Sequence, residues 1–279
     1  MPTHPPGQTA CSDWTLPAEA HLLRIEGADA LAFAQAQFAS DLRELVIGRW
    51  QWSAWLDAQG RVRALLQLAR SDEQTLIALL RGGSGDALAQ DLRRYVLRAR
   101  VRITPQRAWL HARPLASGGG GSALLQATRL RLDAGSHVLD LDLAADREPD
   151  PGPDDRNAAA LAVVRAGHPW LPEVARGTLL PPALSLLRLQ AVSLGKGCYP
   201  GQELVARLHY RGGHKRRLAR VRLAAPQPPG SLAIMAGQAA LLLNGASDGR
   251  EWEALAVLSE PPSTAAITVQ GIVLEVFPA

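Results

Sequence analysis

The residues best suited to chemistry lie together in the segment 196–203, Lys-Gly-Cys-Tyr-Pro-Gly-Gln-Glu. Two glycines, which tolerate backbone angles closed to other residues, flank a thiol, a phenol ring and a proline whose φ angle is fixed. We therefore expect a tight, stiff loop that presents Cys198 and Tyr199. A thiol reacts as its thiolate, and Lys196 is a cation able to stabilise that form. A glycine–proline turn with an incidental buried cysteine is the competing interpretation.

Three kinds of chemistry are open to Cys198. A nucleophilic cysteine needs a base, and the nearest histidines in sequence, His209 and His214, lie outside the loop. A zinc or iron–sulfur site needs several ligands, and the only other cysteine is Cys11. A cluster shared with a partner protein stays open. Thiol exchange needs only an exposed thiol with a lowered pKa, so we favour a functional thiol over a structural one.

The composition is that of a globular protein of two or three domains. The chain has 279 residues, of which 47% are hydrophobic and 20% charged, and a formal net charge of +4. The sequence contains no dense basic run with interleaved aromatic residues, which is the pattern that would indicate a nucleic-acid surface. Two cysteines make no disulfide framework, which favours a reducing, cytoplasmic setting. The N-terminus does not resemble a signal peptide, and no apolar run is long enough to span a membrane.

The hydrophobic pattern predicts a mixed α+β protein. Strands are expected over residues 22–25, 50–56, 61–68, 74–80 and 96–103, and helices beginning after Asp29 and after Asp86 as N-caps. Further strands are expected over residues 123–132 and 137–143, and a helix over 158–166. Short apolar strands over residues 215–223, 239–243, 254–258 and 266–277 then predict a small barrel or sandwich, with a domain boundary near residue 213.

The segment 196–203 resembles the signature of the YgfZ-type folate-binding proteins, which are relatives of the glycine-cleavage T-protein, an aminomethyltransferase. Weaker similarity extends over residues 27–41, 56–62, 95–101 and 206–218. Ala39-Ser40 departs from the Thr-Asn that the family often has before Asp41.

The resemblance implies an α+β fold in which three domains form an aminomethyltransferase-like ring around a folate site. Residues 14–49 plus 157–213 would form a discontinuous folate-binding domain, and residues 50–156 an inserted α+β domain. Residues 214–279 would form a C-terminal β-barrel. Residues 1–13 are expected to be a disordered leader.

The resemblance also implies roles for individual residues. Cys198 would be the reacting thiol, and Lys196, Gly197 and Gly201 would shape its loop. Folate contacts are expected from Asp41, Tyr199, Gln202, Glu203 and Arg207, and no resident metal is expected. Several alternatives stay open: Gln202 and Glu203 as loop-closing or helix-capping groups, Asp41 as an ordinary loop carboxylate, Tyr199 as core and Arg207 as a surface arginine.

The function implied by the resemblance is that of a monomeric accessory protein, not an enzyme. It would bind tetrahydrofolate or another reduced folate and support iron–sulfur cluster assembly or repair, and thereby the maturation of cluster enzymes, including tRNA-modifying ones. Its partners would be iron–sulfur assembly or target proteins, with a cluster present only if shared with a partner. The alternative is a folate-dependent aminomethyltransferase. A third reading, contact with tRNA, rests on the arginines of residues 216–222.

Overall fold

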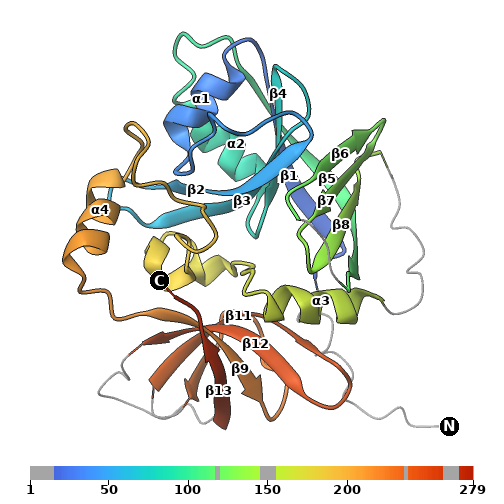
Figure 1. The fold of residues 1–279 in the computed structure, drawn as a ribbon, viewed down its shortest axis with the longest axis vertical. Coiled ribbons are helices and arrows are strands. Elements are labelled where there is room, and N and C mark those ends of the chain that lie inside the picture. Colours follow the sequence, from blue (N-terminus) through green and yellow to red (C-terminus); the bar gives the residue numbers. More distant parts are fainter. Residues whose placement is uncertain (1–15, 117–119, 145–154, 236–237, 260–269, 279) are drawn as a thin grey trace, which may run out of the picture.

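The computed structural model describes residues 16–116, 120–144, 155–235, 238–259 and 270–278. The leader expected over residues 1–13, with Cys11, lies outside these ranges. Figure 1 shows a large sheet with two helices at one end of the molecule and a barrel at the other. Within the described ranges, no helix has the length and apolar character that a membrane-spanning segment requires.

The first part of the chain is rich in strands. Its elements are β1 (Glu19–Glu26), α1 (Ala30–Gln37), β2 (Arg49–Leu56), β3 (Val62–Arg70), β4 (Thr75–Leu80), α2 (Gly85–Arg93), β5 (Arg102–Pro114), β6 (Ala123–Gln126), β7 (Arg129–Asp133) and β8 (His137–Asp142). The second part holds α3 (Asp155–Arg165), the 3-10 helices η2 (Glu173–Ala175) and η3 (Pro181–Leu184), α4 (Gln202–Arg211), β9 (Arg217–Leu223), β10 (Leu232–Met235), β11 (Gln238–Ser247), β12 (Trp252–Ser259) and β13 (Gln270–Val276).

Strands β1 to β8 form one sheet in the order β2-β3-β4-β1-β5-β8-β7-β6. β1 pairs in antiparallel fashion with β4 on one side and β5 on the other. One sheet therefore unites strands from residues 14–49 and 50–156, which were expected in different domains. Since a shared sheet does not define where a folding unit ends, the division at residue 49 stays a prediction.

Both faces of the sheet are buried around its central strands. The adjacent residues Leu22 and Leu23 of β1 belong to two different hydrophobic cores. Phe33 of α1 and Leu88 of α2 pack in the Leu23 core. The Leu22 core includes residues of the segment 159–192. Because both faces exclude water, β3 and β4 are buried along almost their whole length and are mostly apolar, and each fully buried leucine contributes about 1.5–3 kcal/mol.

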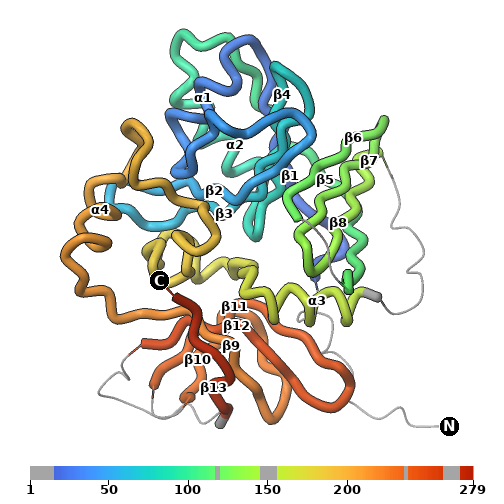
Figure 2. Tube along the Cα trace, viewed as in Figure 1, coloured from blue at the N-terminus to red at the C-terminus, as the bar shows by residue number. Residues whose placement is uncertain are grey.

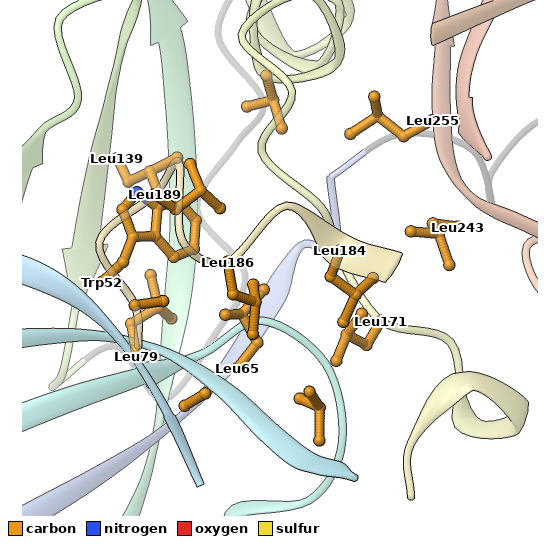
Figure 3. Close-up of a cluster of buried hydrophobic side chains, with 14 of the residues drawn as sticks. Trp52, Leu65, Leu79, Leu139, Leu171, Leu184, Leu186, Leu189, Leu243 and Leu255 are labelled. Carbon is orange, nitrogen blue, oxygen red and sulfur yellow. The ribbon is translucent and has the colours of Figure 1, made fainter. Parts of the chain in front are cut away.

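Strands β9 to β13 close into a barrel in the order β10-β11-β12-β9-β13. The barrel contacts the rest of the chain through apolar side chains: Figure 3 shows Leu243 and Leu255 of the barrel facing the region of Leu171 and Leu184. An ion pair reinforces this contact. The Glu253 carboxylate, 6% exposed, accepts from Arg165 at 2.6 Å.

Three predicted elements differ from the structure. The strand over residues 96–103 is wrong: residues 96–101 form an irregular segment with a bend, and β5 begins at Arg102. Asp29 occupies the N-cap position of α1 as predicted, but its carboxylate makes no hydrogen bond to the helix and accepts from the main-chain N–H of Arg100 instead. The strand over 123–132 is two strands, β6 and β7, joined by a tight turn. Helix α2 is capped by Ser84, not by Asp86.

Candidate functional site

Lys196 anchors the Cys198 loop, which we define as residues 193–201. Its ammonium group donates to the carbonyl oxygens of Gln35, Phe38 (2.6 Å) and Ser40 (3.0 Å), at the C-terminal end of α1. The last carbonyls of a helix lack partners within the helix, and its dipole favours a cation there. An ammonium group has three N–H donors, so this cluster uses all of them.

This geometry gives Lys196 a different role from the expected one. With its three donors engaged, the ammonium group has none left for a hydrogen bond to a Cys198 thiolate. Burial lowers the pKa of Lys196 to about 8, and the negative charge of Asp41 opposes that shift. The lysine therefore fixes the loop to α1, close to Asp41, and does not activate the thiol directly.

Tyr199 and Gln202 close the same loop. The buried Tyr199 donates its hydroxyl to the Ser193 carbonyl at 3.0 Å, and its ring lies 5.3 Å from the Lys196 nitrogen. Gln202, the first residue of α4, donates its side-chain amide to the Lys196 carbonyl at 3.2 Å. Tyr199 is only 6% exposed as a residue, so its ring offers little surface for stacking on folate. The loop-closing interpretation of Gln202 and the core interpretation of Tyr199 fit this geometry.

Gly201 is required where the loop contacts the β2–β3 hairpin. Its φ angle is +78°, and a Cβ atom there would lie 2.5 Å from the Asp57 carbonyl oxygen and 2.6 Å from Gly60 Cα. Figure 2 shows the start of α4 beside this end of β2 and β3. Gly197 differs, because its φ angle is not positive and a Cβ atom would meet no atom within 4 Å. Only the second of the two glycines has the special backbone expected of both.

The two glycines make a matched pair of variants. Gly201→Ala should lower the free energy of unfolding by at least about 2 kcal/mol, because it combines left-handed strain with overlap on a neighbouring main chain. Gly197→Ala should change it by less than about 0.5 kcal/mol, as expected where nothing is displaced. Urea unfolding of both variants measures this difference. Equal losses would contradict the close packing at Gly201.

Cys198 is the exposed residue of this loop that carries the thiol. Within the part of the chain that the structure describes, no side chain hydrogen-bonds to the thiol, and no group of three or more His, Cys, Asp or Glu residues could hold a metal ion. Glu203 and Arg207 are exposed on α4. The described residues therefore provide an accessible thiol without a neighbouring base.

Asp41 follows α1 and carries a dense set of hydrogen bonds. Arg43 donates to both of its carboxylate oxygens, and Gln35 donates to Oδ1 at 3.2 Å. These contacts, above all those with Arg43, hold the pKa of Asp41 well below its usual range. The Asp41 side chain is 27% exposed and that of Arg43 is 68% exposed. A ligand could therefore reach the carboxylate only by displacing or sharing Arg43.

The structure brings some predicted residues together and leaves others apart. Asp41 and the Cys198 loop are joined through Lys196, which binds the Ser40 carbonyl. Glu203 and Arg207 have no contact with Asp41 among the described hydrogen bonds and ion pairs. Three cavities among the described residues, next to His111, Trp55 and Glu26 respectively, are lined neither by Asp41 nor by the Cys198 loop.

Sequence reasoning missed the residues that support Asp41. The sequence does indicate the pairing of Arg43 with Asp41, since a cation two positions from a carboxylate can pair with it. Gln35 was harder to find, because its amide spans the turn after α1 by donating to Asp41 and accepting from the Leu42 N–H at 2.7 Å. Gln51 of β2 donates to the Asp41 carbonyl at 2.9 Å. These contacts depend on where α1 ends.

Two of the four arginines considered for tRNA contact, Arg220 and Arg222, form ion pairs in the barrel. Arg220 of β9 pairs with Glu253 at 3.0 Å and with Glu275 at 3.4 Å. Arg222 pairs with Glu251 at 2.9 Å. Neighbouring carboxylates therefore balance the charge of these two arginines, which weakens the argument for RNA contact through them, whereas Arg216 and Arg217 are exposed.

Comparison with curated proteins finds relatives along most of the chain. A tRNA-modifying protein YgfZ from Edwardsiella ictaluri is 29% identical over 232 residues, covering 74% of this chain and 70% of its own. The protein of the same name from Pectobacterium carotovorum is 27% identical over 241 residues, covering 76% and 69%. The chain is a relative of the YgfZ proteins. An uncharacterized protein of Haemophilus influenzae is 28% identical over 198 residues, covering 71% and 69%.

These findings confirm the resemblance to YgfZ that was inferred from residues 196–203. No family model matches the chain. Among solved structures, the glycine cleavage system aminomethyltransferase T from Bartonella henselae matches with a TM-score of 0.64 and 14% identity, covering 86% of this chain and 76% of its own. The chain therefore shares the mixed α+β fold of the T-protein, as the expected relation between YgfZ and T-proteins requires. Identity this low carries no conclusion about substrate.

Proposed function

We propose that this chain is a folate-binding accessory protein that supports the assembly or repair of iron–sulfur clusters. Through this role it would promote the maturation of cluster enzymes, including tRNA-modifying ones. The observation that carries the proposal is the exposed Cys198 on a loop fixed from within by the buried Lys196. The relatives named tRNA-modifying protein YgfZ support the link to tRNA modification.

The proposed role of Cys198 is to act on a species that a partner supplies. A lone thiol cannot complete a metal site, so a cluster would be shared with a protein that provides the other ligands. An exposed thiol is also suited to exchange with a partner's thiol or sulfur species. The frame made by Lys196, Tyr199 and Gln202 would hold the thiol in one place for that contact.

Asp41 is the proposed contact for the pterin ring of tetrahydrofolate. A carboxylate is an acceptor for the paired N–H donors of an aminopterin, and such charge-assisted hydrogen bonds are strong. The donor set now around Asp41, an arginine fork and an amide, shows that the carboxylate accepts paired N–H groups. The folate would therefore replace part of the contact with Arg43. Gln202, Glu203 and Arg207 stay proposed as further contacts.

Asp41→Asn should weaken tetrahydrofolate binding by roughly tenfold to a hundredfold, because a charged acceptor is lost. Arg43→Ala should tighten binding severalfold, because the competing guanidinium is removed. An anaerobic equilibrium titration followed by tryptophan fluorescence measures both affinities.

Arg107→Ala is a control for the loss of an exposed arginine elsewhere. Arg107 pairs with Glu19 at 3.1 Å and lies on β5, away from α1. The affinity of the Arg107→Ala protein for tetrahydrofolate should equal that of the wild type. Binding that is unchanged by Asp41→Asn would remove Asp41 from the proposed folate site, and no binding by the wild type would remove the folate itself.

The alternative function is folate-dependent aminomethyl transfer, which the shared T-protein fold favours. An accessory protein binds tetrahydrofolate without turnover, whereas a transferase forms methylene-tetrahydrofolate from an aminomethyl donor. A direct assay of that product separates the two. The three-domain ring, the monomeric state and the cytoplasmic setting also remain proposals.

A further inference from the structure

Arg81, at the end of β4, is a fully buried cation. Its guanidinium donates to the Pro169 and His168 carbonyls and to Gln67 Oε1, each at 3.3 Å. The ring of Trp170 lies 4.3 Å from the guanidinium carbon and that of Trp52 lies 5.4 Å from it. Among the described residues, no carboxylate forms an ion pair with Arg81. A buried charge without a counter-charge is costly, so its compensation has to be found elsewhere.

The carbonyls near the end of α3 compensate only part of this charge. A helix C-terminus carries about half a negative elementary charge. Two arginines share that region: Arg81 binds the His168 and Pro169 carbonyls, and Arg188 binds those of Ala166 and Gly167. The region therefore keeps a net positive charge.

The polar atoms left unpaired around Arg81 are able to act as donors. Gln67 uses its oxygen to accept from Arg81, which leaves its buried Nε2 amide without a partner among the described residues. His137 has Nδ1 2.9 Å from Ser136 Oγ and a buried, unpaired Nε2. His168 has a buried, unpaired Nδ1. Each imidazole nitrogen can carry the proton in one tautomer.

These side chains form one cluster. The rings of His137 and His168 have centroids 5.4 Å apart, and those of Trp52 and His168 are 5.1 Å apart. Figure 3 shows Trp52 beside Leu139 and Leu189 in the same core. Burial, together with the positive charge of Arg81, lowers the pKa of His137 to about 3, and the same causes hold the pKa of His168 well below its usual value. Both imidazoles are therefore neutral, and Arg81 carries the positive charge of the cluster.

We propose that the Arg81 cluster binds a small monovalent anion of the size and charge of chloride. The positive charge selects an anion, and the unpaired donors of Gln67, His137 and His168 supply hydrogen bonds that a buried polar group otherwise lacks. Water would satisfy the donors but would leave the charge without a partner. The rings of Trp52 and Trp170 on the guanidinium and the full burial of Arg81 favour a small ligand.

A crystal of the full chain grown in sodium bromide tests the proposal directly. Bromide is a chloride-sized anion with an anomalous signal. The expected result is an anomalous peak within hydrogen-bond distance of the Arg81 guanidinium and of at least one of Gln67, His137 or His168. Density at that point without an anomalous signal would indicate water and would overturn the proposal, as would the absence of density.

Thermal unfolding gives an independent measurement on the same protein in solution. At matched ionic strength, replacing sodium gluconate, whose anion is too large to enter, by 0.2 M sodium chloride should raise the wild-type Tm by about 3–6 °C if the ion binds with roughly 10 mM affinity. Arg81→Met should lose this chloride-specific rise, and the exposed-site control Arg107→Met should keep it. An equal rise in all three proteins would contradict a site at Arg81. If Arg81→Met does not fold, the presence or absence of the anomalous bromide peak alone tests the proposal.

Discussion

A Lys196→Met protein should unfold at a markedly lower urea concentration than the wild type. The change keeps the length of the side chain but removes every donor to the Gln35, Phe38 and Ser40 carbonyls. An acceptor left unsatisfied in a buried position costs about 1–3 kcal/mol, so the three lost hydrogen bonds cost at least about 3 kcal/mol before any compensation. Relief of the desolvation of a buried ammonium group offsets part of this cost.

Lys215→Met is the matched control, because Lys215 is the only other lysine in the chain and is exposed. It should change the free energy of unfolding by less than about 0.5 kcal/mol. The Lys196 variant should also show a faster reaction of Cys198 with a bulky thiol reagent, since its loop loses the anchor. Unfolding free energies that agree between the two variants would contradict the anchoring role.

Cys198→Ala should fold normally and fail in function. The thiol is exposed and has no hydrogen-bond partner among the described residues, so its removal should change the free energy of unfolding by less than about 0.5 kcal/mol. Tetrahydrofolate affinity should stay within twofold of the wild type, since Asp41 and Lys196 are untouched. Activity of a dependent cluster enzyme should fall at least about tenfold, the effect expected when a reacting group is lost.

Cys11→Ala provides the control, because Cys11 and Cys198 are the two cysteines of the chain. That variant retains Cys198 and should behave like the wild type in stability, folate affinity and function. Loss of function in Cys11→Ala with retention in Cys198→Ala would move the chemistry to the N-terminal segment.

The fold was predictable where local pattern decides it. Strands β1, β3 and β4 were expected within a few residues of their bounds. The arginine-rich segment 96–103 was not, because its alternation imitates a strand while Arg100 is held in an irregular segment by Asp29. That pairing joins residues far apart in sequence, and no local pattern records it.

The site was predictable at its motif but not in its contacts. The exposed thiol and the need for Gly201 follow from the sequence of the loop. The role of Lys196 does not, because its partners are main-chain carbonyls at the end of α1 and any sequence could supply them. The burial of Tyr199 likewise depends on the packing of the loop over the core.

Complementation at matched protein levels tests the central claim most directly. A bacterial strain that needs such a factor for a cluster-dependent tRNA-modifying enzyme would receive the wild type, Cys198→Ala or Cys11→Ala, and the modified nucleoside would be quantified. The proposed function predicts full restoration by the wild type and by Cys11→Ala, and a Cys198→Ala result no higher than that of the empty vector. Full restoration by Cys198→Ala would contradict it.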